Sequence, residues 1–466
     1  MKKTLSILLV ATATLAIVGC QKDPLPNQKE SYDFKIERLR DVGQKIPNPK
    51  ITLSDCIPEG SKETLESIRY VEGKPIYYMD YTAKVDWENL LTQEEGQYFD
   101  VFCMTDVTNK VSKALFKTPL PKGELSDLGG SCSGFICTNS KGELLNCRNF
   151  DGAYGEMVVV FNHNVKPGEH KSVMMTDLNG AQKFSRVGGY GDGDKVLLKS
   201  GIELNVLLRQ PISTVDGMND AGLVLTTYQL PDYQTQDSTL VDPYPSLTPR
   251  PYGTDQRIPG KKQSNFMALA YLALTTCATV DDVVKLFDSY NYVALDKSAN
   301  IHWCFSDAKG ELWNTKDHWR TLEYWPSESE ERQGAGNPKG MTDILYVYDE
   351  EARSKSAFLG NHNIAYEYMS MENYYYHPTP SSTFYIDYWQ RAFGGVFRAH
   401  NMMNYYSLVM DEEKALSVLQ QGNFGIEVPG QVTNWSCVYN GKQKTILFNV
   451  RDQVDRAFTI DLKTDL

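Results

Sequence analysis

Two short segments of the chain hold residue types that together could activate a thiol. The first begins with Cys132, and the second holds Arg148 and Asp151. The N-S-K-G sequence at 139–142 lies between them and is typical of a hairpin turn, so the flanking strands should pair and bring these residues close together. A cysteine has an ordinary pKa of about 8.5 and reacts as the thiolate, so a neighbouring cation or base favours nucleophilic catalysis.

The sequence around this cysteine resembles the choloylglycine hydrolase and linear amide C–N hydrolase family, which includes penicillin V acylases and bile salt hydrolases. Both charged residues follow the cysteine at the family's spacing. Two further blocks match in order, D-G-M-N-D-A-G-L at 216–223 and T-N-W-S-C-V-Y at 433–439, so the resemblance covers about residues 132–462. The chain is also similar to the acid ceramidase and N-acylethanolamine amidase branch, which shares a long segment before the nucleophile.

The resemblance implies an α+β fold, the four-layer αββα sandwich of N-terminal-nucleophile (Ntn) hydrolases with antiparallel sheets. Such a chain cuts itself before its nucleophile, here between Ser131 and Cys132, and the freed α-amine becomes the base. That amine has a pKa of about 7.7–8, close to that of the thiol, so no histidine is needed. Asp151 would hold the amine, and Arg148 would stabilise the thiolate or orient Asp151. A surface ion pair is the alternative for these two residues.

The family also implies two donors to the oxyanion and a late arginine. Counting along the strand after residues 222–223, the first donor falls on Gln229, or on Tyr228 if the register slips by one residue. The family usually has Asn or Tyr there, so the glutamine is a departure. The candidates are Asn361 or Asn363 for the second donor and Arg391 or Arg398 for the arginine. The alternative for the asparagine is an ordinary turn residue, and the alternative for the arginine is a solvated side chain on a helix.

The composition limits the partners. The 466 residues include 47 Lys and Arg against 59 Asp and Glu, a formal net charge of −12 with no basic block, which argues against a nucleic-acid partner. The seven histidines show no ligand spacing and the nine cysteines form no C-x-x-C pair, so we predict no metal and no cofactor. Cys137 and Cys147 could approach each other on the paired strands, although buried free thiols are equally consistent.

The first 19 residues are typical of a lipoprotein signal peptide. Lys2 and Lys3 precede an apolar run at 5–18 that is too short to span a bilayer, and I-V-G before Cys20 resembles a lipobox. We therefore expect lipid on Cys20. The following Q-K-D resembles the export signal of Bacteroidota lipoproteins, which favours the outer membrane, on its periplasmic or cell-surface side. A plain signal peptide is the alternative.

The rest of the chain is divided by composition. Polar, proline-containing residues 20–50 predict a tether. Residues 51–131 are predicted to form a pro-segment or N-terminal subunit, and 132–466 the catalytic domain. Strands, then helices, then strands favour a sandwich over alternating βαβ units. The expected strands are two within 68–79, then 135–138, 144–148, 156–162, 171–177, 212–215, 223–228, 301–306, 312–313, 435–439, 444–450 and 457–462; the expected helices are 105–116, 264–277, one from Thr279, 385–400 and 411–421.

We expect an enzyme that hydrolyses a small N-acyl amide through a thioester. The long segment before the cysteine favours substrates with fatty or aromatic acyl groups. Conjugated bile salts and penicillin V are the other candidate substrates. Tyrosines at 374–388 together with Trp389 could line an acyl pocket, although packing explains them as well. The alternatives are an acyltransferase that uses the same cysteine, and a non-catalytic surface lipoprotein that binds glycans or peptides. A homo-oligomer is also left open.

Overall fold

The computed structural model describes part of the chain. The described residues are 33–46, 58–88, 92–93, 132–152, 156–177, 204–229, 262–293, 301–309, 320–325, 342–347, 358–360, 409–421, 432–450 and 455–466. They form a mixed α/β structure with two large sheets and one small sheet. No helix in these ranges is long and apolar enough to cross a membrane.

The two large sheets hold most of the described strands. The seven-stranded sheet runs β1 (Lys35–Arg38), β20 (Arg456–Asp461), β19 (Thr445–Val450), β18 (Val432–Asn440), β7 (Leu144–Gly152), β6 (Ser133–Thr138) and β17 (Phe358–Gly360). The ten-stranded sheet runs β16 (Thr342–Val347), β15 (Arg320–Trp325), β14 (Ile301–Ser306), β11 (Val224–Gln229), β10 (Thr214–Asn219), β9 (Ser172–Asp177), β8 (Met157–Asn162), β4 (Ile76–Tyr81), β3 (Arg69–Val71) and β2 (Gly43–Lys45). The small sheet holds β13 (Tyr290–Val293), β12 (Lys262–Asn265) and β5 (Thr92–Gln93).

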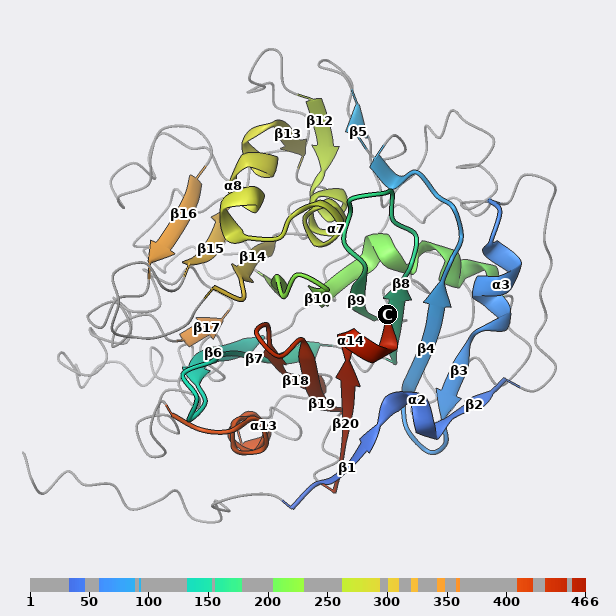
Figure 1. Ribbon diagram of the computed structural model, residues 1–466, viewed down its shortest axis with the longest axis vertical. Helices are drawn as coiled ribbons and strands as arrows, with labels where there is room; N and C mark the ends of the chain where they lie inside the picture. The colour runs from blue at the N-terminus through green and yellow to red at the C-terminus, as the bar shows by residue number, and fades with distance from the viewer. Residues whose placement is uncertain are drawn as a thin grey trace, which may run out of the picture.

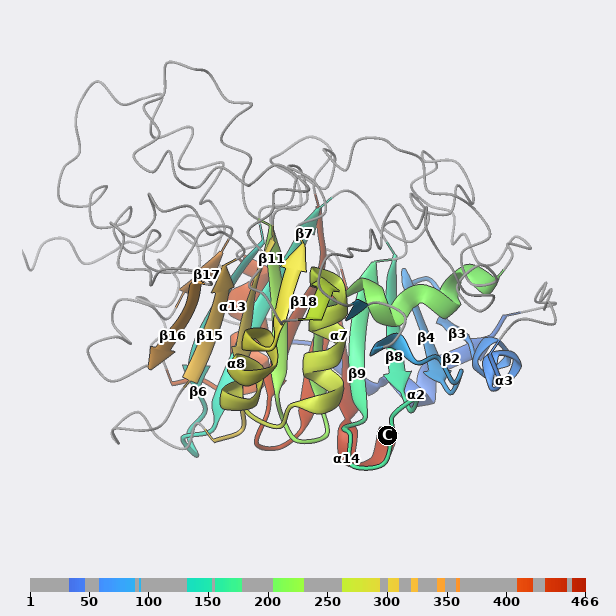
Figure 2. The same ribbon diagram turned by 90° about the horizontal axis from the view of Figure 1, so that it is seen from above.

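Helices cover the outer faces of the two large sheets. The described helices are α2 (Leu39–Val42), α3 (Ser61–Glu66), the 3₁₀ helix η3 (Leu204–Ser213), α7 (Phe266–Thr276), α8 (Val280–Asp288), α13 (Glu412–Gln421) and α14 (Leu462–Asp465). Figures 1 and 2 show α7 and α8 on one side of the molecule and α13 on the other, with the sheets between them. In the described residues, the order of layers is therefore helix, sheet, sheet, helix.

Three hydrophobic cores fill the spaces between these layers. The first lies between α7, α8 and the ten-stranded sheet, the second between the two sheets, and the third between the seven-stranded sheet and α13. Representative residues of the three cores are Leu225 and Leu269, Met218 and Phe448, and Cys147 and Leu416, respectively. Helix α7 is apolar on nearly all sides because it is buried, whereas α8 is amphipathic.

The sheets are mixed rather than purely antiparallel, which corrects the expected topology. Strand β1 pairs in parallel with β20, and β4 pairs in parallel with β8 (Figure 1). Both strands come from residues 33–88, which thus contribute strands to both large sheets. Residues 33–46 lie in the range for which the sequence predicts a tether, and here they form β1, α2 and β2.

Local signals in the sequence explain much of the rest. The hairpins expected around 139–142 and 219–222 are confirmed, as are the paired strands β8 and β9 and the closing strands β18 to β20. Helix α8 begins after Thr279, as predicted, because Thr279 and Asp282 exchange side-chain and backbone hydrogen bonds in a capping box. The expected helices 105–116 and 385–400 and the strand 312–313 lie outside the described residues.

Candidate active site

The β6–β7 hairpin places Cys132 beside Arg148. The strands are antiparallel, with Gly134 opposite Arg148, and Cys132 directly precedes β6. In the turn, the side chain of Asn139 accepts hydrogen bonds from the backbone N–H groups of residues 141 and 143, and Gly142 has a φ of 74°. The hairpin predicted from the sequence is therefore formed, and it brings the thiol and the guanidinium together.

Arg148 is at the centre of a buried polar network. Its Nη2 donates to the Cys132 sulfur at 3.4 Å and to the carbonyl oxygen of Thr227, while its Nη1 lies 2.7 Å from Asp216 Oδ2. The Arg148 and Asp216 side chains are both 0% exposed, and Cys132 is 5% exposed. The surface ion pair weighed as an alternative for Arg148 is therefore wrong, because the side chain lies between the two sheets.

Asp216 belongs to the site although the sequence did not single it out. The indole N–H of Trp435 donates to its Oδ2 at 2.8 Å, and the Thr227 backbone N–H lies 3.5 Å from Oδ1. Trp435 also stacks on Phe150 with ring centroids 4.2 Å apart. The available signal was position, since Asp216 opens the block at 216–223 and Trp435 lies in the block at 433–439.

The turn of the block at 216–223 holds Asp216 in register. The side chain of Asn219 accepts from the backbone N–H groups of Ala221 and Leu223 and donates to two carbonyls at the end of α7. Gly222 has a φ of 90°, and a β-carbon there would lie 2.2 Å from the carbonyl oxygen of Gly441. The turn therefore requires glycine, and it fixes the β10–β11 pair that carries Asp216 and Thr227.

Asp151 lies next to Cys132, but the contact with the thiol is made by the backbone. The Cys132 thiol donates to the Asp151 carbonyl oxygen at 3.8 Å, and the Asp151 carboxylate accepts a hydrogen bond from Thr433 Oγ1. Thr433 lies opposite Asp151 on β18, where the register shifts before Trp435. The structure thus places Asp151 next to Cys132. Ser131 lies outside the described residues, so a role for the Asp151 carboxylate at the amine stays a prediction.

Burial has the largest effect on the pKa values of Cys132 and Asp216. Desolvation raises the pKa of the Cys132 thiol to about 11, although the charge of Arg148 acts in the opposite direction. Burial also raises the pKa of Asp216, and Arg148, Trp435 and the Thr227 N–H oppose that rise. Three donors point at the Asp216 carboxyl oxygens, which is the pattern expected for the ionised form.

This electrostatic setting predicts the pH dependence of Cys132 reactivity. With a thiol pKa of about 11, the thiolate fraction of the uncut chain rises about tenfold per pH unit through the neutral and mildly alkaline range. We expect the rate of Cys132 alkylation by iodoacetamide to rise in proportion to the thiolate fraction from about pH 7 to about pH 9.5. Tryptic peptide 123–141 contains Cys132 and Cys137, so fragment-ion mass spectrometry after a short pulse, which locates the label on Cys132, reports this rate. A rate that levels off near pH 8.5, as for a solvated thiol, would contradict a desolvated sulfur.

The remaining candidates are placed in part or not at all. Gln229 ends β11 opposite Ile301, two residues after Thr227, and neither its side chain nor that of Tyr228 is described. Gly360, which precedes Asn361, pairs with Ser133, the residue after Cys132. The other predicted positions lie outside the described residues: Cys20, Ser131, Asn361, Asn363, Arg391, Arg398 and the tyrosines at 374–388 with Trp389.

The described residues contain no group of three or more His, Cys, Asp or Glu side chains arranged to hold a metal ion. Six cysteines in these ranges are buried and form no disulfide: Cys132, Cys137, Cys147, Cys277, Cys304 and Cys437. A pocket of about 350 Å³ lies between residues 82–88, residues 163–169 and α7, and its lining shares no residue with the Cys132 network.

Comparison with known proteins found no matching family model and no matching curated protein. Solved structures do match. Penicillin V acylase from Agrobacterium tumefaciens is 15% identical over 72% of this chain and 87% of that chain, with a TM-score of 0.41. A variant of conjugated bile acid hydrolase from Clostridium perfringens is 11% identical over 72% and 93%, with a TM-score of 0.42. The N-acylethanolamine-hydrolyzing acid amidase ortholog of Caenorhabditis elegans is 11% identical over 67% and 93%, with a TM-score of 0.33. Our proposal for the function rests on the residues around Cys132.

Proposed function

We propose that this chain is a self-processing Ntn hydrolase that cleaves linear amide bonds of N-acyl compounds through a thioester on Cys132. The observation that carries the proposal is the contact between the Cys132 sulfur and Arg148 Nη2 inside a fully buried network. A solvated cysteine needs no such partner, and a buried structural cysteine is usually packed among apolar side chains. A guanidinium aimed at sulfur stabilises a thiolate.

Self-processing would come first. The Cys132 sulfur attacks the carbonyl carbon of Ser131, the C–N bond breaks as the acyl group moves to sulfur, and the thiol proton ends on the released nitrogen. Water then hydrolyses this thioester, which leaves a carboxylate on Ser131 and a free α-amine on Cys132. The amine has a pKa of about 7.7–8, so after cleavage the thiol has a base within its own residue.

Amide hydrolysis would use the same atoms. The α-amine takes the thiol proton while the sulfur attacks the substrate carbonyl, and the oxyanion accepts hydrogen bonds from donors that we assign to Gln229 and Asn361. The C–N bond then breaks, and the leaving amine receives the proton from the α-ammonium. Water attacks the thioester, its proton goes to the α-amine, and the thiol is restored as the acid leaves. Asp151 would orient the amine, and Arg391 is our candidate for the late arginine that the family resemblance implies.

A substrate panel tests the proposal. The family resemblance suggests N-acyl amides with fatty or aromatic acyl groups, conjugated bile salts and penicillin V. Purified protein should release amine from at least one of these classes, and the matched Cys132→Ala protein should not. Transfer of the acyl group to an added amine, with no acid formed in its absence, would indicate an acyltransferase. Release of amine by both proteins at equal rates would overturn the proposal.

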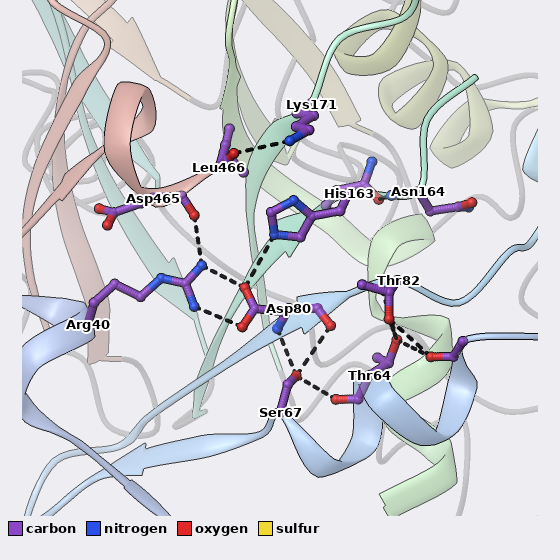
Figure 3. Close-up of polar contacts among 12 residues, drawn as sticks. Arg40, Thr64, Ser67, Asp80, Thr82, His163, Asn164, Lys171, Asp465 and Leu466 are labelled. Atoms are coloured by element: carbon purple, nitrogen blue, oxygen red, sulfur yellow. Dashed lines mark hydrogen bonds and ion pairs between the residues drawn. The ribbon is translucent and has the colours of Figure 1, made fainter. Parts of the chain in front are cut away.

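The two pieces of a cleaved chain would stay together as one enzyme. Residues 33–88 contribute β1 next to β20 and β4 next to β8, so backbone hydrogen bonds join the pieces in both large sheets. Figure 3 shows the polar cluster at this junction, where Arg40 and Asp80 of the first piece meet Asp465 and His163 of the second. Arg40 Nη2 lies 2.6 Å from Asp80 Oδ1 and donates to the Asp465 carbonyl oxygen at 2.8 Å.

We therefore expect the pieces 20–131 and 132–466 to co-elute in gel filtration and to separate only in denaturant. Although burial acts to raise it, hydrogen bonds from His163 and Arg40 hold the pKa of Asp80 well below its ordinary value, so mild acid should not separate them. Arg40→Ala should lower the urea concentration at which they part. Lys84→Ala is the control, because Lys84 pairs with Glu59 inside the first piece. Separate peaks in native buffer would contradict a shared fold.

The proposed location is the outer membrane, through lipid on Cys20. Cells supplied with labelled fatty acid should incorporate the label into the wild-type chain and not into Cys20→Ala. Equal labelling of both chains would contradict this assignment.

A further inference from the structure

The ion pair between Arg148 and Asp216 has a geometry that the reaction steps above do not explain. Arg148 Nη1 is 2.7 Å from Asp216 Oδ2, and both side chains are completely buried. The Nη2 of the same guanidinium is left to contact the Cys132 sulfur at 3.4 Å and the Thr227 carbonyl oxygen. Because a guanidinium is planar and rigid, the contact that holds Nη1 also fixes the direction of Nη2.

Asp216 is itself held from two sides. The Trp435 indole N–H donates to the same Oδ2 that contacts Arg148, at 2.8 Å, and the Thr227 backbone N–H lies 3.5 Å from Oδ1. Thr227 thus contacts both members of the ion pair. Its backbone N–H lies near the Asp216 carboxylate, and its carbonyl oxygen accepts a hydrogen bond from the Arg148 guanidinium. The carboxylate reaches Arg148 from β10, in the sheet opposite β7, so the network spans the space between the two sheets.

The charges in this space also compete. Water does not reach the pair, so the positive charge of Arg148 acts strongly on any nearby anion. The anions in this space are the Asp216 carboxylate, the Asp151 carboxylate, which also acts on the Cys132 thiol, and the Cys132 sulfur once ionised; Asp216 is the one held directly by Arg148 Nη1. Asp216 therefore limits how much of the guanidinium charge acts on the sulfur, in addition to aiming Nη2.

We propose that Asp216 is a positioning residue that fixes the Arg148 guanidinium toward Cys132 and shares its charge with the sulfur. The inference rests on the proposed role of Cys132 as the nucleophile. Asp216 touches neither the substrate nor the sulfur in this account and acts through Arg148. Trp435 supports it as the donor that holds its carboxylate in place.

Asp216→Asn keeps the size of the side chain and removes its charge. The full charge of Arg148 then falls on the sulfur, so the thiolate forms at lower pH. A pKa lower by about one unit gives about tenfold more thiolate that is about threefold less nucleophilic, so alkylation of Cys132 at about pH 7.5 should be about threefold faster. Amide hydrolysis should nevertheless fall about tenfold or more, because the guanidinium loses the carboxylate that fixes its direction toward the sulfur. A purely structural role would lower stability without making the thiol more acidic.

The test compares alkylation of Cys132 in wild-type protein, Asp216→Asn and a matched control. Asp220→Asn serves as the control, since Asp220 lies in the same hairpin but pairs with His170 at the surface. Mass spectrometry separates peptide 123–141 of the uncut chain from 132–141 of the cut chain, so variants are compared in the same state, and fragment ions distinguish label on Cys132 from label on Cys137. Faster alkylation in Asp216→Asn, with wild-type rates in Asp220→Asn, supports the inference. A folded Asp216→Asn protein that alkylates at the wild-type rate or slower overturns it.

A second variant covers the case in which Asp216→Asn does not fold, and the alkylation comparison also stands apart from the proposed function. If Asp216→Asn does not fold, Trp435→Phe removes one donor and keeps both charges; the carboxylate then binds Arg148 more strongly, and alkylation should slow about two- to threefold. Unchanged or faster alkylation would contradict the inference. If wild-type protein neither cleaves itself nor hydrolyses any amide, the proposed function fails, while the alkylation comparison still decides whether Asp216 acts on the thiol through Arg148.

Discussion

Cys132→Ala should remain a single chain and should lose amide hydrolysis by about 10³-fold or more. The sulfur is the atom proposed to attack both the Ser131 carbonyl and the substrate, so both reactions should stop together. The site is buried and the change is small, so the protein should still fold. Denaturing electrophoresis reports the chain, and release of amine reports turnover.

Cys132→Ser separates the two reactions. A hydroxyl is a weaker nucleophile than a thiol, so processing should slow and hydrolysis should be abolished. Cys277→Ser is the control, since Cys277 is an equally buried free cysteine in the core beside α7. Normal processing and turnover in Cys277→Ser, with both impaired at Cys132, would tie the chemistry to this one sulfur. Full turnover in Cys132→Ala would remove Cys132 from the mechanism.

Arg148→Met is expected to have the second large effect, on stability as well as on turnover. Removing one member of a buried ion pair leaves the other charge uncompensated, which costs about 3–5 kcal/mol. Asp216 would be that stranded charge, and the thiol would lose its cation. Urea unfolding should therefore show a much lower midpoint, and hydrolysis should fall below detection.

The double variant Arg148→Met with Asp216→Leu distinguishes stability from catalysis. Replacing both members of a buried pair by apolar residues is often close to neutral, so much of the stability should return. Hydrolysis should not return, because no cation then faces Cys132. Recovery of hydrolysis together with stability would show that Arg148 serves the fold alone.

The sequence was sufficient where local chemistry decides the structure. The turn at 139–142 and the block at 216–223 predicted two hairpins correctly, because an Asn side chain and a Gly of positive φ close each of them. The spacing of Arg148 from Cys132 followed from the first of these hairpins. Helix α8 was predicted from its Thr279 cap for the same reason.

The sequence was insufficient where distant segments meet. Asp216 reaches Arg148 across the space between two sheets, and nothing in the spacing of the two residues indicates which strands face each other. Residues 33–46 are polar and resemble a linker, yet β1 forms because β20 offers an open edge for pairing. The assignments of Gln229, Asn361 and Arg391 stay predictions, since the described side chains do not include them.

The intact mass of the purified, active protein tests the central claim most directly. The account predicts two chains that co-purify, the larger with the mass of residues 132–466 and with Cys132 as its first residue. The same measurement on Cys132→Ala should give one uncut chain. An amide hydrolase that is active as a single uncut chain, or that is cut at a different bond, would contradict the account.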